Sequence, residues 1–196
     1  MKYVVVLCEG MSDEPLDELE GRTPLAIAKS SHMDTLARVS EVGMVHNIPK
    51  GTVPDSYTAN LAILGYDCTI DRESENEEPE NHFEDFYTKT GKRAAIISAD
   101  DNLRKIAELT NISFIEVEGA TGTLNTNFAG KKDAAISALF EKDFDLVIIH
   151  IKGLEEVSMA KSIEKKVHGI ESIDAYLVGP LLEEIQGRAI EFRIVI

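Results

Sequence analysis

The sequence predicts an α/β fold with three layers, in which helices cover both faces of a largely parallel sheet. Short apolar runs rich in valine and isoleucine alternate with segments of helical periodicity. Several of these runs are almost continuously apolar, as in strands that are covered on both faces. The chain has 196 residues, 43% of them hydrophobic, which is enough for one core. Residues 1–196 are therefore expected to form a single domain.

Six strands are expected, each an apolar run bounded by polar or turn residues. They are Tyr3 to Cys8, Val42 to Ile48, Arg93 to Ser98, Ser113 to Val117, Leu146 to Ile151 and Phe192 to Ile196. Ligands of open α/β sheets bind beyond the carboxyl ends of the strands. The polar residues that follow these runs are therefore candidates for a functional site.

Helices are expected between the strands, at residues 24–29, 33–40, 56–64, 102–109 and 131–140, with one long helix from about 156 to 184. Apolar residues in the long helix recur at steps of three and four, and we interpret the resulting stripe as core packing. The stripe consists of Ile163, Val167, Ile170, Ile173, Leu177, Leu181 and Ile185. Gly179-Pro180 should kink or restart the helix.

The charge of the chain excludes some classes of partner. The formal net charge is -15, which disfavours binding to nucleic acid and to anionic membranes, because both require clustered lysine and arginine. No apolar stretch is long enough to cross a bilayer, and Glu9 comes too early for a signal peptide. The two cysteines form no disulfide framework. We therefore expect a cytoplasmic protein.

The acidic residues are concentrated in one segment. From Asp71 to Phe86 there are eight carboxylates and one arginine, a composition that resists burial. We interpret about 71–91 as a solvated linker. The alternative, a cation-binding loop, lacks the regular Asp/Asn spacing and the turn glycine of an EF-hand.

Four groups of polar residues follow predicted strands or open the helix after one, and they are Glu9-Gly10, Ser56, Ser98–Asp101 and His150–Glu156. The simplest role of Ser56 is to cap its helix. In a functional role, the free N–H groups and the helix dipole would favour a phosphate on or beside the serine oxygen. A hydroxyl nucleophile also needs a base or a metal.

Eight segments of the sequence form a set of motifs, and they lie at residues 5–15, 21–25, 33–37, 56–67, 94–99, 118–127, 144–150 and 166–182. In order and spacing, these segments resemble the archaeal-type cofactor-independent phosphoglycerate mutases, and the resemblance covers most of the chain. The resemblance implies the catalytic-domain fold of the alkaline phosphatase superfamily. It also implies a two-metal phosphotransferase, in which a serine accepts a phosphoryl group from the substrate and returns it to the other hydroxyl of the glycerate.

The positions that match the family's site are only partly kept. Ser56 matches the nucleophile, and Glu9 stands where the family has a ligand aspartate. A second aspartate and a histidine, both ligands in the family, are replaced by Glu155 and Met159. A thioether cannot replace an imidazole for a hard ion such as Mn²⁺ or Mg²⁺. His150 matches a family position that need not be a ligand.

Two further parts of the family pattern are not found in the sequence. The family's last strand runs into an Asp-His metal motif, whereas this sequence ends at Ile196. Between Asp67 and Arg93 the family carries a substrate-binding cap domain, and here the acidic linker takes that place. The resemblance therefore implies no two-metal site, and either no metal or one weakly bound divalent cation (Mn or Mg).

Three interpretations follow. The first is a degenerate or truncated family member with little or no mutase activity, which binds a protein partner, a second copy or a phosphorylated small molecule. The second is a fragment of an active phosphoglycerate mutase. The third is a reduced metal-dependent phosphatase or phosphotransferase, and it would use Ser56 and Glu9 with Asp100, Asp101 or Glu155.

Overall fold

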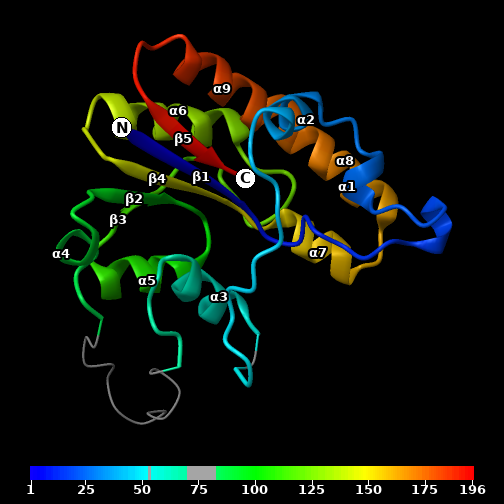
Figure 1. Cartoon of the computed structure of the whole chain (residues 1–196), viewed down its shortest axis with the longest axis horizontal. Coiled ribbons are helices and arrows are strands. Elements are labelled where there is room, and N and C mark those ends of the chain that lie inside the picture. Colours follow the sequence, from blue (N-terminus) through cyan, green and yellow to red (C-terminus); the bar gives the residue numbers. More distant parts are fainter. Residues whose placement is uncertain (53, 70–82) are drawn as a thin grey trace.

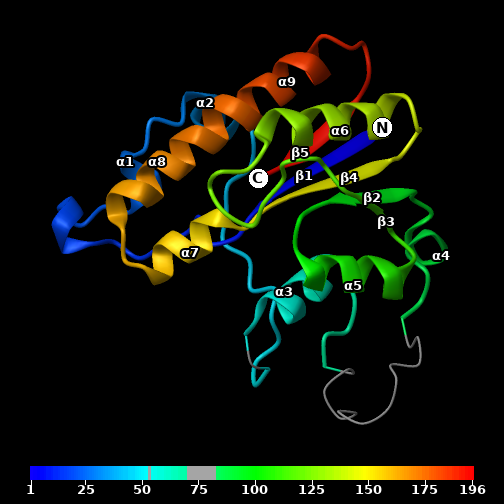
Figure 2. The ribbon, with the colours of Figure 1, turned by 180° about the vertical axis from the view of Figure 1, so that it is seen from behind.

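A computed structural model describes residues 1–52, 54–69 and 83–196. At its centre lies a parallel sheet of five strands in the order β3-β2-β4-β1-β5, with helices on both faces (Figure 1 and Figure 2). The predicted three-layer α/β fold is confirmed. The strands are β1 (Lys2–Cys8), β2 (Ala94–Ile97), β3 (Ser113–Ile115), β4 (Leu146–Ile151) and β5 (Phe192–Val195).

Two groups of helices cover the sheet. One face packs against α2 (Ser31–Arg38), α6 (Phe128–Phe140), α8 (Ile163–Ile173) and α9 (Gly179–Gln186). The other packs against α3 (Ser56–Ile63), α4 (Phe86–Thr90) and α5 (Asp101–Thr110). The described residues also form the short 3₁₀ turn Asp17–Leu19, α1 (Pro24–Ile27), α7 (Gly153–Met159) and the π-helical turn Asp174–Val178.

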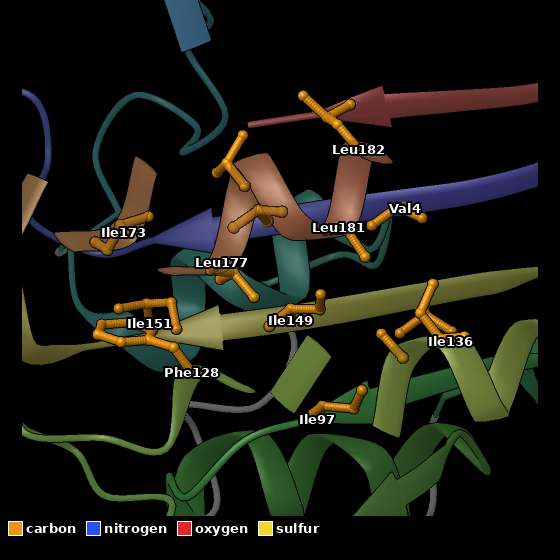
Figure 3. Packing of buried hydrophobic residues seen from close by; sticks show 14 of the residues in the cluster. Val4, Ile97, Phe128, Ile136, Ile149, Ile151, Ile173, Leu177, Leu181 and Leu182 are labelled. Atoms are coloured by element: carbon orange, nitrogen blue, oxygen red, sulfur yellow. The ribbon is translucent and has the colours of Figure 1, made fainter. Parts of the chain in front are cut away.

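The central strand β4 explains why its sequence is almost continuously apolar. It lies between β1 and β2 and is covered on both faces. Val147, Ile149 and Ile151 belong to the larger core cluster, shown in part in Figure 3, whereas Ile148 belongs to the cluster on the other face. Alternate side chains of one strand therefore enter two different cores.

The predicted strand from Val42 to Ile48 is wrong. These residues form no regular structure, and Met44 is 92% exposed. A strand needs a neighbour for its backbone groups and a layer over its side chains, so β-branched residues alone do not create one.

The prediction of one helix from about 156 to 184 is also wrong, because the segment is divided. The first part, α7, ends where Lys161 adopts φ +52° and the Ser162 N–H donates to the Val157 carbonyl, which is a Schellman motif. A π-helical turn, Asp174–Val178, then precedes α9. Pro180 has no N–H for the carbonyl four residues earlier, so the predicted restart at Gly179 is confirmed.

The segment predicted as a solvated linker contains an ordered part. Asp85 caps α4 by accepting from the Thr88 N–H at 2.9 Å, and Phe86 is buried. Gly91 ends the helix in a left-handed conformation. The rest of the predicted linker, up to residue 82, lies outside the described residues, as does the position expected for a cap domain.

Buried ionic groups tie distant segments to the larger core. The Asp174 carboxylate, 2% exposed, accepts from the backbone N–H groups of His32 and Met33 at 3.2 and 2.8 Å, so it caps α2 from across the fold. Lys166 in α8 bonds to Asp13 at 2.6 Å and holds the loop after β1. In the described part of the chain, no helix is both long and apolar enough to span a membrane.

Candidate functional site

The site lies where three adjacent strands end. Because β1 and β2 both pair with β4, the residues after them meet at one edge of the sheet. Glu9 follows β1, Ser98 follows β2, and His150 is the penultimate residue of β4. The helix α3 brings Ser56 to the same edge, beside Glu9. The strand order therefore brings together the groups that the sequence singled out separately.

His150 is at the centre of this arrangement and is 2% exposed. Its Nδ1 lies 2.9 Å from the Ser98 hydroxyl oxygen, which accepts from the Asp100 N–H at 3.0 Å. The Ser98 hydrogen is therefore available for Nδ1, and this assignment places the ring hydrogen on Nε2. Nε2 faces Glu9 Oε2 at 3.4 Å. Both atoms are buried without a hydrogen-bond partner among the described residues.

Glu9 is the group that contacts the candidate nucleophile. Its Oε1 lies 3.4 Å from the Asn60 amide nitrogen, one turn along α3 from Ser56. Burial raises the pKa of Glu9, but the neighbouring His150 ring, a hydrogen bond with Ser56 and the charge of Lys152 together hold it below its ordinary value. Glu9 is therefore an ionised carboxylate at neutral pH.

Ser56 does not cap its helix. The side chain of Asp55 accepts from the Thr58 N–H at 2.8 Å and is the N-cap of α3, so the capping role considered for Ser56 belongs to its neighbour. Ser56 is the first helical residue. It is half-buried, and its hydroxyl hydrogen bonds with Glu9.

The turn after β1 packs tightly against α7. Gly10 has φ +81°, and a Cβ at this position would lie 2.5 Å from the backbone nitrogen of Glu155. Only glycine permits both this conformation and this approach. A Cβ on Gly153 would likewise lie 2.3 Å from the Leu124 nitrogen. These two contacts fix α7, and with it Glu155, beside the Glu9 turn.

Lys152 is a cationic residue of the site, and it lies in the candidate group His150–Glu156 without having been given a role of its own. Its ammonium lies 2.7 Å from Asp100 Oδ2. This hydrogen bond raises the pKa of Lys152; burial opposes the rise, and attraction by Asp100, Glu9 and Glu155 adds to it. The only feature of the sequence that pointed to a role for Lys152 in the site was its position directly after β4.

Asp100 is committed to structural contacts. Besides binding Lys152, it caps α5 by accepting from the N–H groups of Asn102 and Leu103 at 2.9 and 3.2 Å. Burial raises its pKa, but the hydrogen bond from Lys152 and those from the backbone keep it below the ordinary value. Asp101 is exposed and lies 3.8 Å from Arg104. Asp100 thus binds Lys152 and the backbone of α5, and Asp101 lies beside Arg104. Neither carboxylate is positioned by a contact with Ser56.

Met159 does not belong to the packed part of the site. It is the last residue of α7 and is 78% exposed. A thioether at this position would not replace an imidazole ligand for Mn²⁺ or Mg²⁺.

The residues present do not fit a two-metal centre. No group of three or more His, Cys, Asp or Glu side chains within residues 1–52, 54–69 and 83–196 is arranged to hold a metal ion. Glu9 has one oxygen without a partner among these residues, but it faces the Nε2 atom to which the hydrogen is assigned. Glu9 and the Ser56 hydroxyl could together contact at most one cation.

A buried lysine supports the site from the opposite face of the sheet. Lys131 in α6 is 1% exposed and donates to the His150 carbonyl at 2.7 Å. Burial lowers the pKa of Lys131 to about 8 and raises that of the nearby Cys8 thiol to about 12. Lys131 thus holds the end of β4, from which His150 and Lys152 extend.

The Asn125–Asn127 segment belongs to the loop before α6. Asn127 accepts from the Gly130 N–H at 2.8 Å and caps α6, while its amide donates to the Glu118 carbonyl at 2.9 Å. The loop lines a cavity of about 530 Å³ beside α8.

Known proteins are similar to this chain in sequence and in fold. The sequence profile of the metalloenzyme superfamily matches residues 1–194. The 2,3-bisphosphoglycerate-independent phosphoglycerate mutase of Methanothrix thermoacetophila is 24% identical over 334 aligned positions, which cover 100% of this chain and 85% of that protein. The corresponding mutase of Methanosarcina mazei is 41% identical over 114 residues, 58% of this chain and 28% of that protein.

The first alignment is longer than the 196 residues of this chain, so that relative contains long stretches with no counterpart here. Solved structures show the same fold. A protein from Pyrococcus horikoshii superposes with a TM-score of 0.79 at 23% identity, covering 93% of this chain and 74% of that one. The cofactor-independent phosphoglycerate mutase of Thermoplasma acidophilum gives 0.69 at 13% identity, covering 99% and 85%.

The profile match covers nearly the whole chain, and the relatives are those that the sequence motifs indicated. The chain belongs to the metalloenzyme superfamily and is related to the archaeal-type cofactor-independent phosphoglycerate mutases.

Proposed function

We propose that this chain is a phosphoglycerate-mutase-like protein with little or no mutase activity, whose Ser56 site binds a phosphorylated small molecule weakly. One observation carries the proposal. The Ser56 hydroxyl has a carboxylate partner in Glu9, whereas the position matching a ligand histidine is the exposed thioether of Met159. The serine at the nucleophile position is kept, but fewer groups remain that could activate its hydroxyl.

The charges around Ser56 explain why binding would be weak. Glu9, Asp100 and Glu155 bring three carboxylates, and Lys152 brings one ammonium that Asp100 already holds. A phosphate monoester dianion is therefore repelled unless a divalent cation accompanies it. With Glu9 and Ser56 as its protein ligands, one Mn²⁺ or Mg²⁺ would be held loosely.

The test is a mutase assay with a nucleophile control. Conversion of 3-phosphoglycerate to 2-phosphoglycerate is followed by ³¹P NMR with added Mn²⁺, for the wild type and for Ser56→Ala. We expect both proteins to show the same background rate, because Met159 cannot supply the imidazole ligand that the resemblance implies. Mn²⁺-dependent conversion that is lost in Ser56→Ala would overturn the proposal.

Binding is measured separately, by titrating 3-phosphoglycerate calorimetrically with Mn²⁺ and with EDTA. Weak heat that requires Mn²⁺ and disappears in Glu9→Gln is expected. Ser137→Ala, on α6 and away from the strand ends, is the matched control. If no heat is seen under either condition, the binding part of the proposal is wrong, whatever the mutase assay gives.

The contact between Glu9 and Ser56 also favours a second candidate, a reduced metal-dependent phosphatase. This candidate predicts Mn²⁺-dependent hydrolysis of p-nitrophenyl phosphate that is absent in Ser56→Ala, and phosphorylation of Ser56 that mass spectrometry would detect. Stoichiometric metal in the purified protein would support it. Absence of both hydrolysis and phosphoserine would exclude it.

The remaining expectations are kept as proposals. We propose a cytoplasmic location, and we propose no nucleic-acid or membrane partner because the acidic composition disfavours binding to polyanions. The fragment interpretation is tested by sequencing the genomic reading frame beyond the codon for Ile196, since an extension containing an Asp-His motif would favour it.

A further inference from the structure

One ammonium group of the chain lies among the carboxylates at the strand ends. Lys152 directly follows the central strand β4, and its Nζ lies 2.7 Å from Asp100 Oδ2. The Lys152 side chain is 31% exposed and that of Asp100 is 9% exposed. Water and salt screen a partly buried ion pair less than a pair on the open surface, so the Lys152 charge acts strongly on its neighbours.

The sheet places Lys152 between carboxylates from both neighbouring strands. On the β1 side, the Glu9 N–H donates to the Ile151 carbonyl at 2.9 Å, so Glu9 stands beside the end of β4. On the β2 side, Asp100 reaches the Lys152 ammonium. Glu155 follows along the chain, where its N–H donates to the Lys152 carbonyl at 3.0 Å. Carboxylates from three separate elements thus lie around one ammonium.

The same negative charge is what a divalent cation would need. Mn²⁺ and Mg²⁺ bind carboxylate oxygens, and their affinity depends on how many charged ligands are free. The Lys152 ammonium attracts Glu9 and Asp100 and is attracted by Glu155. It therefore competes with a cation in two ways, because it holds the Asp100 carboxylate and repels a positive ion that approaches Glu9.

We propose that Lys152 takes the place of a divalent cation among Glu9, Asp100 and Glu155 and thereby keeps the affinity of the Ser56 site for Mn²⁺ and Mg²⁺ low. The inference rests on the proposed function, since it names the residue that makes cation binding weak. It also explains in physical terms why the residues present do not fit a two-metal centre. Part of the positive charge that such a centre would supply comes from the chain itself.

The direct test is the affinity for Mn²⁺ alone, measured at fixed ionic strength from the electron paramagnetic resonance signal of the free ion. Lys152→Gln should lower the dissociation constant by about tenfold or more, because it removes the ammonium and releases Asp100. Lys152→Met, which keeps most of the side-chain volume, should have the same effect.

Lys2→Gln is the matched control. Lys2 also forms an ion pair, at 2.8 Å from Asp143, but it lies at the opposite end of β1 from Glu9. This variant therefore has the same net charge as Lys152→Gln and should bind Mn²⁺ as the wild type does. An equal gain in both variants would show that only the overall charge matters, and the inference would be wrong.

Two further variants separate charge from shape and identify the released carboxylate. Lys152→Arg keeps the positive charge, so its affinity for Mn²⁺ should stay low. Asp100→Asn, added to Lys152→Gln, should remove the gain in affinity. Asparagine is also a good helix cap, so this change leaves α5 in place. A gain that persists in the double variant would contradict the role given to Asp100.

Thermal denaturation checks the folding of each variant and gives a second readout. Without Lys152 the carboxylates repel one another, so Lys152→Gln should melt below the wild type in EDTA. Mn²⁺ should then raise its melting temperature more than that of the wild type, since a ligand of the folded state stabilises it.

Tight Mn²⁺ binding by the wild type, or equal affinity in the wild type and Lys152→Gln, would overturn the inference. Mn²⁺-dependent mutase activity that is lost in Ser56→Ala would overturn the proposed function instead. The two failures are therefore distinguished by separate measurements.

Discussion

Strand β4 and residues 42–48 have similar apolar sequences and opposite environments. In β4, Ile149 is fully buried and hydrogen-bonded neighbours lie on both sides. In the second segment, Met44 and Val45 are almost fully exposed and no strand forms. The difference shows that β propensity is realised only where the fold supplies both a pairing partner and a covering layer. Substitutions on the two sides of this contrast should therefore differ widely in their effects.

The largest effect is expected in the centre of the sheet. Ile149→Ala should lower the free energy of unfolding by about 2–5 kcal/mol, because the side chain is packed in the larger core cluster and its loss leaves a cavity. Urea denaturation followed by circular dichroism measures this change. A loss below about 1 kcal/mol would mean that the core around β4 is loosely packed.

A smaller effect should come from the buried charge beneath β4. Burial lowers the pKa of Lys131 from 10.5 to about 8, so between these values the unfolded chain binds more protons than the folded chain. Stability should therefore rise with pH there, by about 1 kcal/mol from pH 8 to pH 9. Urea titrations at the two pH values measure the rise.

The control for this prediction is Lys131→Met, in which the rise should be absent. Cys8 acts in the opposite direction, because its pKa is raised from 9.0 to about 12 in the folded chain. The unfolded chain therefore loses the thiol proton first, so above about pH 9 the contribution of Cys8 lowers stability and opposes the rise due to Lys131. An equal pH dependence in the wild type and Lys131→Met would show that Lys131 is charged normally in the folded state.

The sequence predicted the structure correctly where the residues of one element determine the conformation of that element. Five buried or pairing runs became strands, and Gly179-Pro180 restarted a helix as expected. Prediction from the sequence failed where residues distant in the chain determine the local structure. The strand expected from Val42 to Ile48 lacked a neighbour, and the break after Met159 depends on a left-handed Lys161 that no periodicity reveals.

The same distinction applies to the site. Glu9, Ser56 and His150 could be placed together in advance, because parallel strands end at a common edge. The ion pair between Lys152 and Asp100 could not, since it depends on the register of β2 against β4. The capping of α3 by Asp55 instead of Ser56 was also undetermined, because both residue types are good caps.

The smallest effect is expected outside the sheet. Val45→Ala should change the free energy of unfolding by no more than about 0.5 kcal/mol in dilute solution, because the side chain is 82% exposed. Parallel urea denaturation of wild type and variant measures the difference. A large effect would show that residues 42–48 are covered within a single chain, and the contrast with β4 would then disappear.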